Sequence, residues 1–139
     1  MTGLLFSSSK SQLSNQDIGL CQISKKTCEN EIHKIRYLFG LDSLEYYSVS
    51  NSELLVVDSI LTTKFREDLF IGNLEDYKGQ YFGAVIDGEK MIFGTLYLNE
   101  DSNFDCNQIT IIRGGGSSFN TFVIDLQDEN KLTFESNNW

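Results

Sequence analysis

An Asp-Gly dipeptide between two runs of alternating apolar residues constrains the fold more than any other feature of this sequence. Asp87-Gly88 separates Tyr81–Ile86 from Met91–Leu98, and Asp-Gly favours the tight turn of a two-residue β-hairpin. In Met91–Leu98 both sets of alternate positions carry apolar side chains, which predicts a central strand covered on both faces. We therefore expect a β-sheet built around this hairpin.

The rest of the chain after residue 40 is typical of further short strands. These are predicted over Glu45–Ser50, Leu54–Thr62, Cys106–Arg113, Phe119–Leu126 and Lys131–Glu135. The stretch Lys64–Ile71 fits either a helical turn or a strand. Short connections indicate antiparallel neighbours, because a parallel crossover needs roughly a dozen or more residues and usually a helix.

One helix is predicted near the N-terminus, over Cys28–Phe39. Thr27 can cap its first turn, and Gly40 stands where a left-handed residue ends many helices. The apolar residues Cys28, Ile32, Ile35 and Phe39 recur with helical spacing. This stripe predicts a helix that packs on the sheet.

The predicted fold is α+β, with an antiparallel sheet of about six to eight strands and one N-terminal helix. A β-sandwich or a partial barrel is the alternative. Residues 1–20 are polar and rich in serine, so we expect a flexible lead-in there and a single globular domain over residues 21–139. A chain of 139 residues is long enough to bury one sizeable core.

Negative charge is concentrated after residue 40. The formal net charge is −9, and residues 41–139 hold 17 acidic against 6 basic side chains. Such a surface repels nucleic acid and anionic membranes and attracts cationic partners. We therefore predict a basic protein as the partner, with no nucleic-acid or membrane partner. The oligomeric state is left open.

The compartment and the redox state of the cysteines are also left open by the sequence. The first residues lack the features of a signal peptide, so the protein is either cytoplasmic and full length, or periplasmic or secreted after removal of a signal. Cys21 and Cys28 lie close enough to form a disulfide that leaves Cys106 free, whereas three reduced thiols suit a cytosolic protein. With one histidine and no C-x-x-C pair, no metal site is predicted.

The most distinctive local string is Arg113-Gly114-Gly115-Gly116-Ser117-Ser118. Its glycines can present backbone N–H groups to an anion, form a flexible hairpin loop, or form a protruding loop whose backbone approaches a partner closely. A phosphate-binding P-loop would need a lysine and a following helix, whereas a strand is predicted here. We favour the hairpin loop.

A second candidate lies over residues 99–105, where Glu100, Asp101 and Asp105 gather in a predicted turn. The string lacks the register and the final glutamate of a calcium loop, so we interpret it as a surface for a cationic partner. Tyr77, at a strand end, is a candidate interface anchor beside it. His33 lies off the helical stripe, one turn after Glu29, and is interpreted as a surface histidine.

The leading hypothesis is a non-enzymatic binding module, an inhibitor or bacterial immunity protein that occludes a basic enzyme or toxin. Its predicted contact residues are Glu100, Asp101, Asp105, Arg113, Gly114, Gly115, Gly116 and Tyr77. No cofactor and no catalytic residue is predicted. The alternative is a small-ligand-binding β-barrel or cup walled by the aromatic strands. A hydrolase that uses two of the carboxylates is a third hypothesis.

Overall fold

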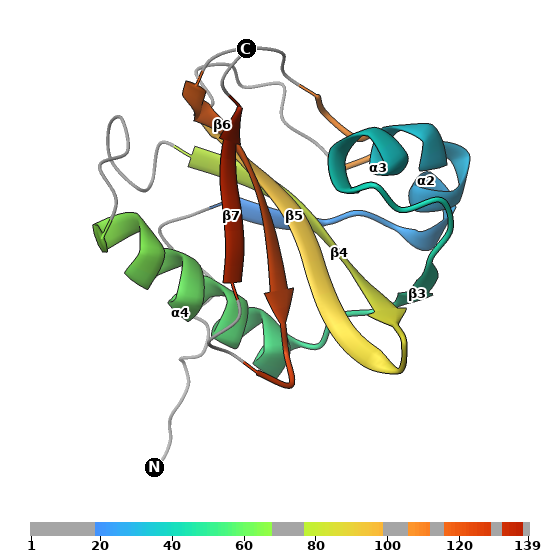
Figure 1. Ribbon diagram of the computed structural model, residues 1–139, viewed down its shortest axis with the longest axis horizontal. Helices are drawn as coiled ribbons and strands as arrows, with labels where there is room; N and C mark the ends of the chain where they lie inside the picture. Colours follow the sequence, from blue (N-terminus) through green and yellow to red (C-terminus); the bar gives the residue numbers. More distant parts are fainter. Residues whose placement is uncertain (1–18, 68–76, 99–105, 112–115, 129–131, 138–139) are drawn as a thin grey trace.

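The computed structural model describes residues 19–67, 77–98, 106–111, 116–128 and 132–137. They form an α+β fold around one open sheet (Figure 1), which confirms the predicted class. The elements are β2 (Gly19–Gln22), α2 (Lys25–Asn30), α3 (Ile32–Phe39), β3 (Glu45–Tyr47), α4 (Asn51–Glu67), β4 (Tyr77–Ile86), β5 (Glu89–Leu98), β6 (Gly116–Asp125) and β7 (Leu132–Asn137). Among these described elements, no helix is long and apolar enough to cross a membrane. Most of the expected lead-in lies outside the described residues, and its last two residues belong to β2.

The strand order is β2-β4-β5-β6-β7, and β3 also pairs with β4. β4 to β7 form an antiparallel meander, as the sequence predicts. β2 departs from that prediction because it pairs with residues 78–81 of β4 in parallel, while β3 pairs antiparallel with residues 83–85 of the same strand. The two short strands thus share one edge of β4. The described residues form six strands, at the lower end of the predicted six to eight, and two of the expected strand segments take other conformations.

The connection between β4 and β5 is the predicted two-residue hairpin. Asp87 has a φ of 52° and Gly88 a φ of 83°, and two successive left-handed residues are what a type I′ turn requires. β5 is central, since it pairs with β4 on one side and β6 on the other. Ile92 is buried on one face of β5 and Phe93 on the other, which confirms the two-sided pattern.

Helices cover both faces of the sheet (Figure 1). On one face, Val57 and Leu61 of α4 pack against a cluster that includes Ile92. On the other face, Cys28 and Ile35, two members of the predicted helical stripe, are buried beside β4 and β5. The sandwich and barrel alternatives are wrong because helices, rather than a second sheet or closure of the first, bury the two apolar faces.

The strand predicted over Leu54–Thr62 is wrong, because Asn51–Glu67 is helix α4. The Ser50 N–H donates to Glu53 Oε1 at 2.9 Å, and the Glu53 N–H donates to Ser50 Oγ at 3.2 Å. This reciprocal pair is a capping box, which satisfies backbone donors at a helix start. The valines and isoleucine of the segment favour a strand by composition, but its buried residues recur one helical turn apart.

The described residues hold three helices instead of the single one predicted. The N-terminal helix begins at Lys25, with Ser24 rather than Thr27 as its cap, and Ser24 Oγ accepts the Thr27 N–H at 3.1 Å. Glu31, with φ −117° and ψ 34°, interrupts the helix between α2 and α3. Gly40 ends α3 with a φ of 73°, as predicted.

The disulfide joins Cys21 of β2 to Cys106, whose Cα atoms lie 6.1 Å apart. Cys28 is a free thiol with no exposed surface. Both possibilities that the sequence left open, a Cys21–Cys28 bridge and three reduced thiols, are therefore wrong. The physical reason is that Cys28 points from α2 into the core, where its side chain packs among the apolar residues that lie against the sheet.

Candidate functional site

Most of the predicted contact residues lie outside the described part of the chain, namely Glu100, Asp101, Asp105, Arg113, Gly114 and Gly115. Gly116 begins β6 and is partnered with Asn137 of β7, next to an irregularity in the register. Tyr77 begins β4 and is fully buried in the cluster beneath α4. Its ring has no exposed surface to offer a partner, because the strand turns it toward the core.

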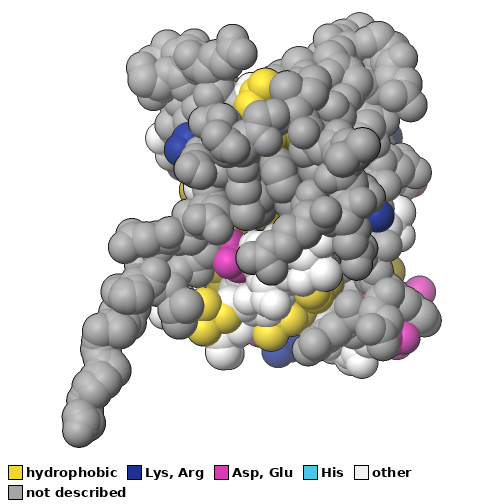
Figure 2. Space-filling model, turned by 90° about the vertical axis from the view of Figure 1, so that its left-hand side faces the viewer, with side chains coloured by type: hydrophobic (Ala, Val, Ile, Leu, Met, Phe, Trp, Pro, Cys, Tyr) yellow, Lys and Arg dark blue, Asp and Glu magenta, His cyan; other side chains and the backbone are white. Residues whose placement is uncertain are grey.

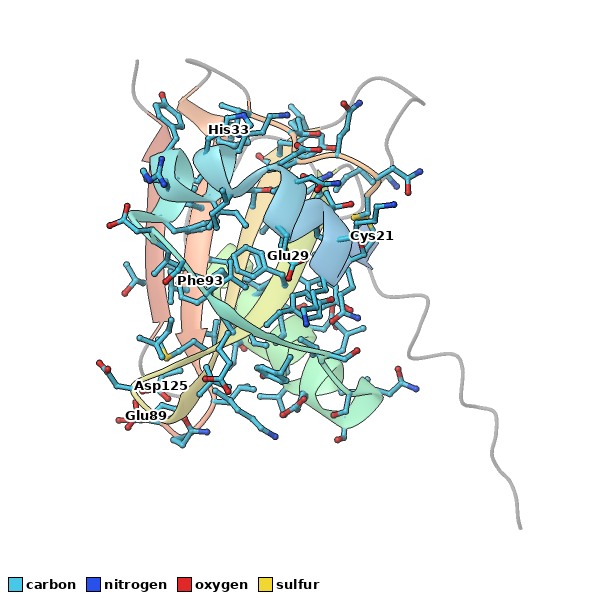
Figure 3. The ribbon with its side chains drawn as sticks, turned by 90° about the vertical axis from the view of Figure 1, so that its right-hand side faces the viewer. Cys21, Glu29, His33, Glu89, Phe93 and Asp125 are labelled. Atoms are coloured by element: carbon cyan, nitrogen blue, oxygen red, sulfur yellow. A yellow bond between two sulfur atoms is a disulfide. The ribbon has the colours of Figure 1, made fainter. Side chains whose placement is uncertain are left out.

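Carboxylates from three segments lie at the same end of the sheet. We refer to them as the acidic end: Glu45 of β3, Asp87 and Glu89 at the β4–β5 turn, and Asp125 and Asp128 where β6 ends. The pairing brings these positions together, because β3 lies beside the last residues of β4 and the start of β5 lies beside the end of β6. Figure 3 shows Glu89 and Asp125 at this end and His33 at the opposite end.

The members of the acidic end differ in exposure. Glu45, Asp87 and Glu89 are exposed. Asp125 is only 7% exposed, and its Oδ1 accepts the Gln127 N–H at 2.9 Å, so this carboxylate shapes the turn after β6. In the side view of Figure 2, acidic side chains are visible at the lower right of the molecule. The exposed carboxylates are the ones available to a partner.

Lys90, the second residue of β5, also lies at this end of the sheet. Its Nζ lies 3.7 Å from Glu53 Oε2 and 5.2 Å from the centre of the Tyr47 ring. Burial, followed by the nearby Glu53 carboxylate, raises the pKa of Tyr47, so the ring stays neutral. Lys90 is therefore balanced by Glu53, and the acidic end keeps its negative charge.

Residues 106–111 form a second distinctive region, which we call the strap. They were expected to belong to a strand, but the described residues 106–111 contain none. The disulfide fixes the first residue of the strap to β2. The Gln80 amide holds its middle, since Nε2 donates to Gln108 O at 2.8 Å and Oε1 accepts the Thr110 N–H at 2.9 Å. A buried side-chain amide thus satisfies backbone groups that a neighbouring strand would otherwise pair.

Residues at the start of α3 also hold the strap, through hydrogen bonds to Ile109. Glu31 Oε1 accepts the Ile109 N–H at 2.9 Å, and Lys34 Nζ donates to Ile109 O at 2.9 Å. Glu31 and Lys34 also pair with each other at 2.9 Å. Burial opposes ionisation of Glu31, but the Ile109 hydrogen bond and Lys34 outweigh it and lower the pKa of Glu31. The residue that interrupts the N-terminal helix therefore also anchors the strap.

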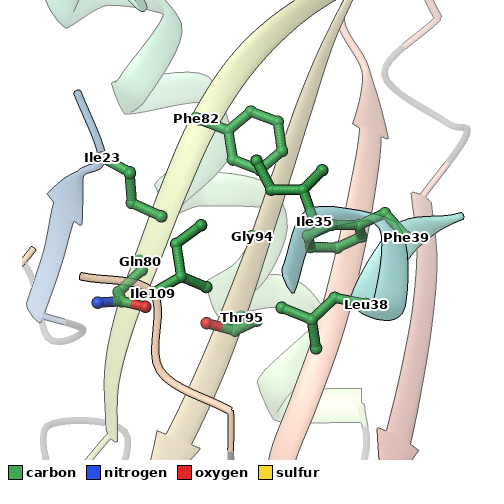
Figure 4. Close-up of a pocket in the computed structure, with 9 residues that line it drawn as sticks. All are labelled: Ile23, Ile35, Leu38, Phe39, Gln80, Phe82, Gly94, Thr95 and Ile109. Atoms are coloured by element: carbon green, nitrogen blue, oxygen red, sulfur yellow. The ribbon is translucent and has the colours of Figure 1, made fainter. Parts of the chain in front are cut away.

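A cavity of about 10 Å³ lies beside the strap, in the layer between α3 and the sheet (Figure 4). Its lining is Ile23, Ile35, Leu38, Phe39, Gln80, Phe82, Gly94, Thr95 and Ile109. Thr95 is only 2% exposed, and its Oγ1 has no hydrogen-bond partner in the described structure. The polar side chains of the lining are therefore Gln80 and Thr95, which are direct partners across β4 and β5.

A wider surface hollow of about 230 Å³ lies between α2 and the residues after α3, with Cys28, Ile32 and Leu44 among its lining. Burial, followed by the charges of Glu29 and Glu31, raises the pKa of Cys28 to about 12. At neutral pH this sulfur is a thiol, which is a poor nucleophile and a poor metal ligand. Across the described ranges, no group of three His, Cys, Asp or Glu side chains is placed to hold a metal ion.

Sequence reasoning missed two buried polar residues, Thr95 and the Gln80 that holds the strap. Gln80 shares a face of its strand with Phe82, and Thr95 lies between Phe93 and Tyr97 on the same face of β5. A polar residue at an apolar alternate position is the signal that identifies such a side chain, because a buried polar group needs a hydrogen-bond partner.

Comparison with protein-family models, with curated proteins and with solved structures finds no match to this chain.

Proposed function

We propose that this protein is a non-enzymatic binding module that holds a basic protein partner against its acidic end. The observation that carries the proposal is that carboxylates from three separate segments lie at the same end of the sheet. Lys90 at this end is already balanced by Glu53. In its most concrete form, the partner is a cationic enzyme or toxin, and this protein is its inhibitor or immunity protein.

The net charge of −9 supports this proposal. A negative potential over one surface steers a cationic partner and raises its association rate, while it disfavours nucleic acid and anionic membranes. Glu100, Asp101, Asp105 and the Arg113–Gly116 loop come after Leu98 and before Ser117, next to the strand ends opposite Glu89 and Asp125, so we do not propose them as part of the acidic-end contact. Tyr77 is left out of the contact surface because it is buried.

The Cys21–Cys106 disulfide supports an oxidising compartment. Such bonds persist in the periplasm and outside the cell and are rare in the cytosol. A covalent link across the fold also suits an inhibitor, because a preorganised surface loses less conformational entropy when it binds. We therefore propose a periplasmic or secreted site of action.

The alternative, a cup for a small ligand, has less support. Ligand pockets usually occupy roughly 300–1,000 Å³. The cavity beside the strap measures about 10 Å³ and the hollow beside Cys28 about 230 Å³, and both are smaller than that range.

Affinity capture from a lysate of the source cell, at low and high salt, tests the proposal. The bait is the wild-type protein, the variant Glu45→Gln/Glu89→Gln, or the control Glu29→Gln/Asp42→Asn. Both variants remove two exposed carboxylates, but only the first pair belongs to the acidic end. The captured protein is identified by mass spectrometry, and its association rate is then measured across a salt series.

We expect one basic protein to be captured by the wild type and the control, with capture weakened by salt. The acidic-end variant should associate roughly tenfold more slowly at low salt, the lower bound for electrostatic steering. Equal association rates for all three proteins would exclude the acidic end as the contact surface. Capture of no protein at either salt would overturn the proposal and direct attention to a small ligand.

A further inference from the structure

The hydroxyl group of Thr95 is buried in the protein interior and has no hydrogen-bond partner among the described residues. The position of Thr95 in central β5 leaves its side chain only 2% exposed. Buried hydroxyl groups in folded proteins are nearly always paired, with protein or with ordered water. A partner for Thr95 is therefore expected inside the layer that it faces.

The cavity beside the strap is where that partner can lie. Thr95 and Gln80 both line it, and they are directly opposed in the β4–β5 register. Figure 4 shows the Thr95 hydroxyl directed toward the Gln80 side chain across the cavity. Directly opposed residues on one face of an antiparallel pair have Cβ atoms about 5 Å apart, a separation that a small bridging molecule can span.

The size of the cavity indicates which molecule can occupy it. Its volume is about 10 Å³, and a buried water needs roughly 10–15 Å³ together with at least two polar partners. A hydroxyl both donates and accepts hydrogen bonds, and an amide offers donors and an acceptor. The remaining lining is aliphatic, aromatic or glycine, so the two polar side chains fix where the molecule binds.

We propose that this cavity is a binding site for one buried water molecule, held by Thr95 Oγ1 and the side chain of Gln80. The water joins the centre of β5 to the amide that holds Gln108 and Thr110 of the strap. The strap is then connected to the middle of the sheet through a continuous chain of hydrogen bonds. This inference is independent of the proposed binding of a basic partner.

A high-resolution crystal structure of the wild-type protein, compared with Thr95→Val and Thr95→Ser, tests the site. The valine keeps the shape of the side chain and removes the hydroxyl, whereas the serine keeps the hydroxyl. We expect a water within hydrogen-bond distance of residue 95 in the wild type and the serine variant, and its loss in the valine variant. A wild-type cavity without density, or a valine variant that keeps the water, would overturn the proposal.

Magnetic relaxation dispersion of water nuclei provides a second test in solution, because it counts long-lived internal waters. The matched control is Thr121→Val, since Thr121 is partnered with Thr95 on β6 but does not line the cavity. We expect Thr95→Val to lose one long-lived water and Thr121→Val to lose none. An equal count in the wild type and Thr95→Val would contradict the site, even where crystals show density.

Discussion

Cys21 is covalently joined to Cys106 across 85 residues of sequence, while Cys28, seven positions after Cys21, remains a free thiol. In the chain-entropy model a closed loop of this length stabilises the fold by about 4.5 kcal/mol. Cys106→Ser should therefore lower the free energy of unfolding by about 4 kcal/mol, as measured by urea denaturation without reductant.

A comparison of single and double variants controls this prediction. Cys21→Ser and the double variant should lose as much as Cys106→Ser, since one bond is broken in every case. A much larger loss in the double variant would indicate that the serines themselves, rather than the lost bond, destabilise the protein.

Cys28 should be inert in the folded protein. Its pKa is raised to about 12, first by burial and then by Glu29 and Glu31, so very little thiolate is present at pH 8. Labelling with a thiol-specific reagent under non-reducing conditions should modify no cysteine in the native state and one in denaturant. Rapid native labelling at position 28 would contradict both the burial and the raised pKa.

Glu31 should make stability depend on pH in the acid range. Its pKa in the folded protein lies below the ordinary value of 4.5, so the ionised form stabilises the folded state. That contribution is fully present above the ordinary pKa and is lost as pH falls through the lowered one. The difference in unfolding free energy between the wild type and Glu31→Gln should be constant above about pH 5.5 and shrink in stronger acid. A difference that stays constant down to pH 2 would refute this role.

The capping box of α4 should be measurable by a single substitution. Ser50→Ala removes the oxygen that accepts the Glu53 N–H, and loss of such a cap costs about 1 kcal/mol. Ser59→Ala, an exposed position within the same helix, serves as the control and should change the unfolding free energy by less than about 0.5 kcal/mol. Equal losses for both variants would show that the cap contributes nothing specific.

Local signals made the central hairpin predictable. Asp87-Gly88 specifies a turn that needs two left-handed residues, and the two-sided apolar pattern around Ile92 and Phe93 specifies a strand buried on both faces. Gly40 likewise marks the end of α3 through its positive φ. These features depend only on residues that are close together in the sequence, so they can be predicted from the sequence alone.

Helix α4, the disulfide and the contacts of Gln80 could not be predicted by considering one expected strand at a time. Ser50 and Glu53 form a sequence-visible capping box, but the β-branched residues after it compete with the helical interpretation. The partner of Cys21 could not be chosen from spacing, because tertiary packing commits Cys28 to the core. Gln80 was visible as a polar residue on an apolar strand face, but its hydrogen-bond partners come from a segment about 30 residues away.

The disulfide also makes the backbone from Cys21 to Cys106 a closed ring. Helices α2 to α4 and strands β3 to β5 lie within that ring, whereas β6 and β7 follow it in a segment that contains no cysteine. A protease that cuts the ring once opens it but releases no fragment, because the two pieces stay joined through sulfur. A cut after Cys106 instead separates the C-terminal hairpin from the rest of the covalent chain.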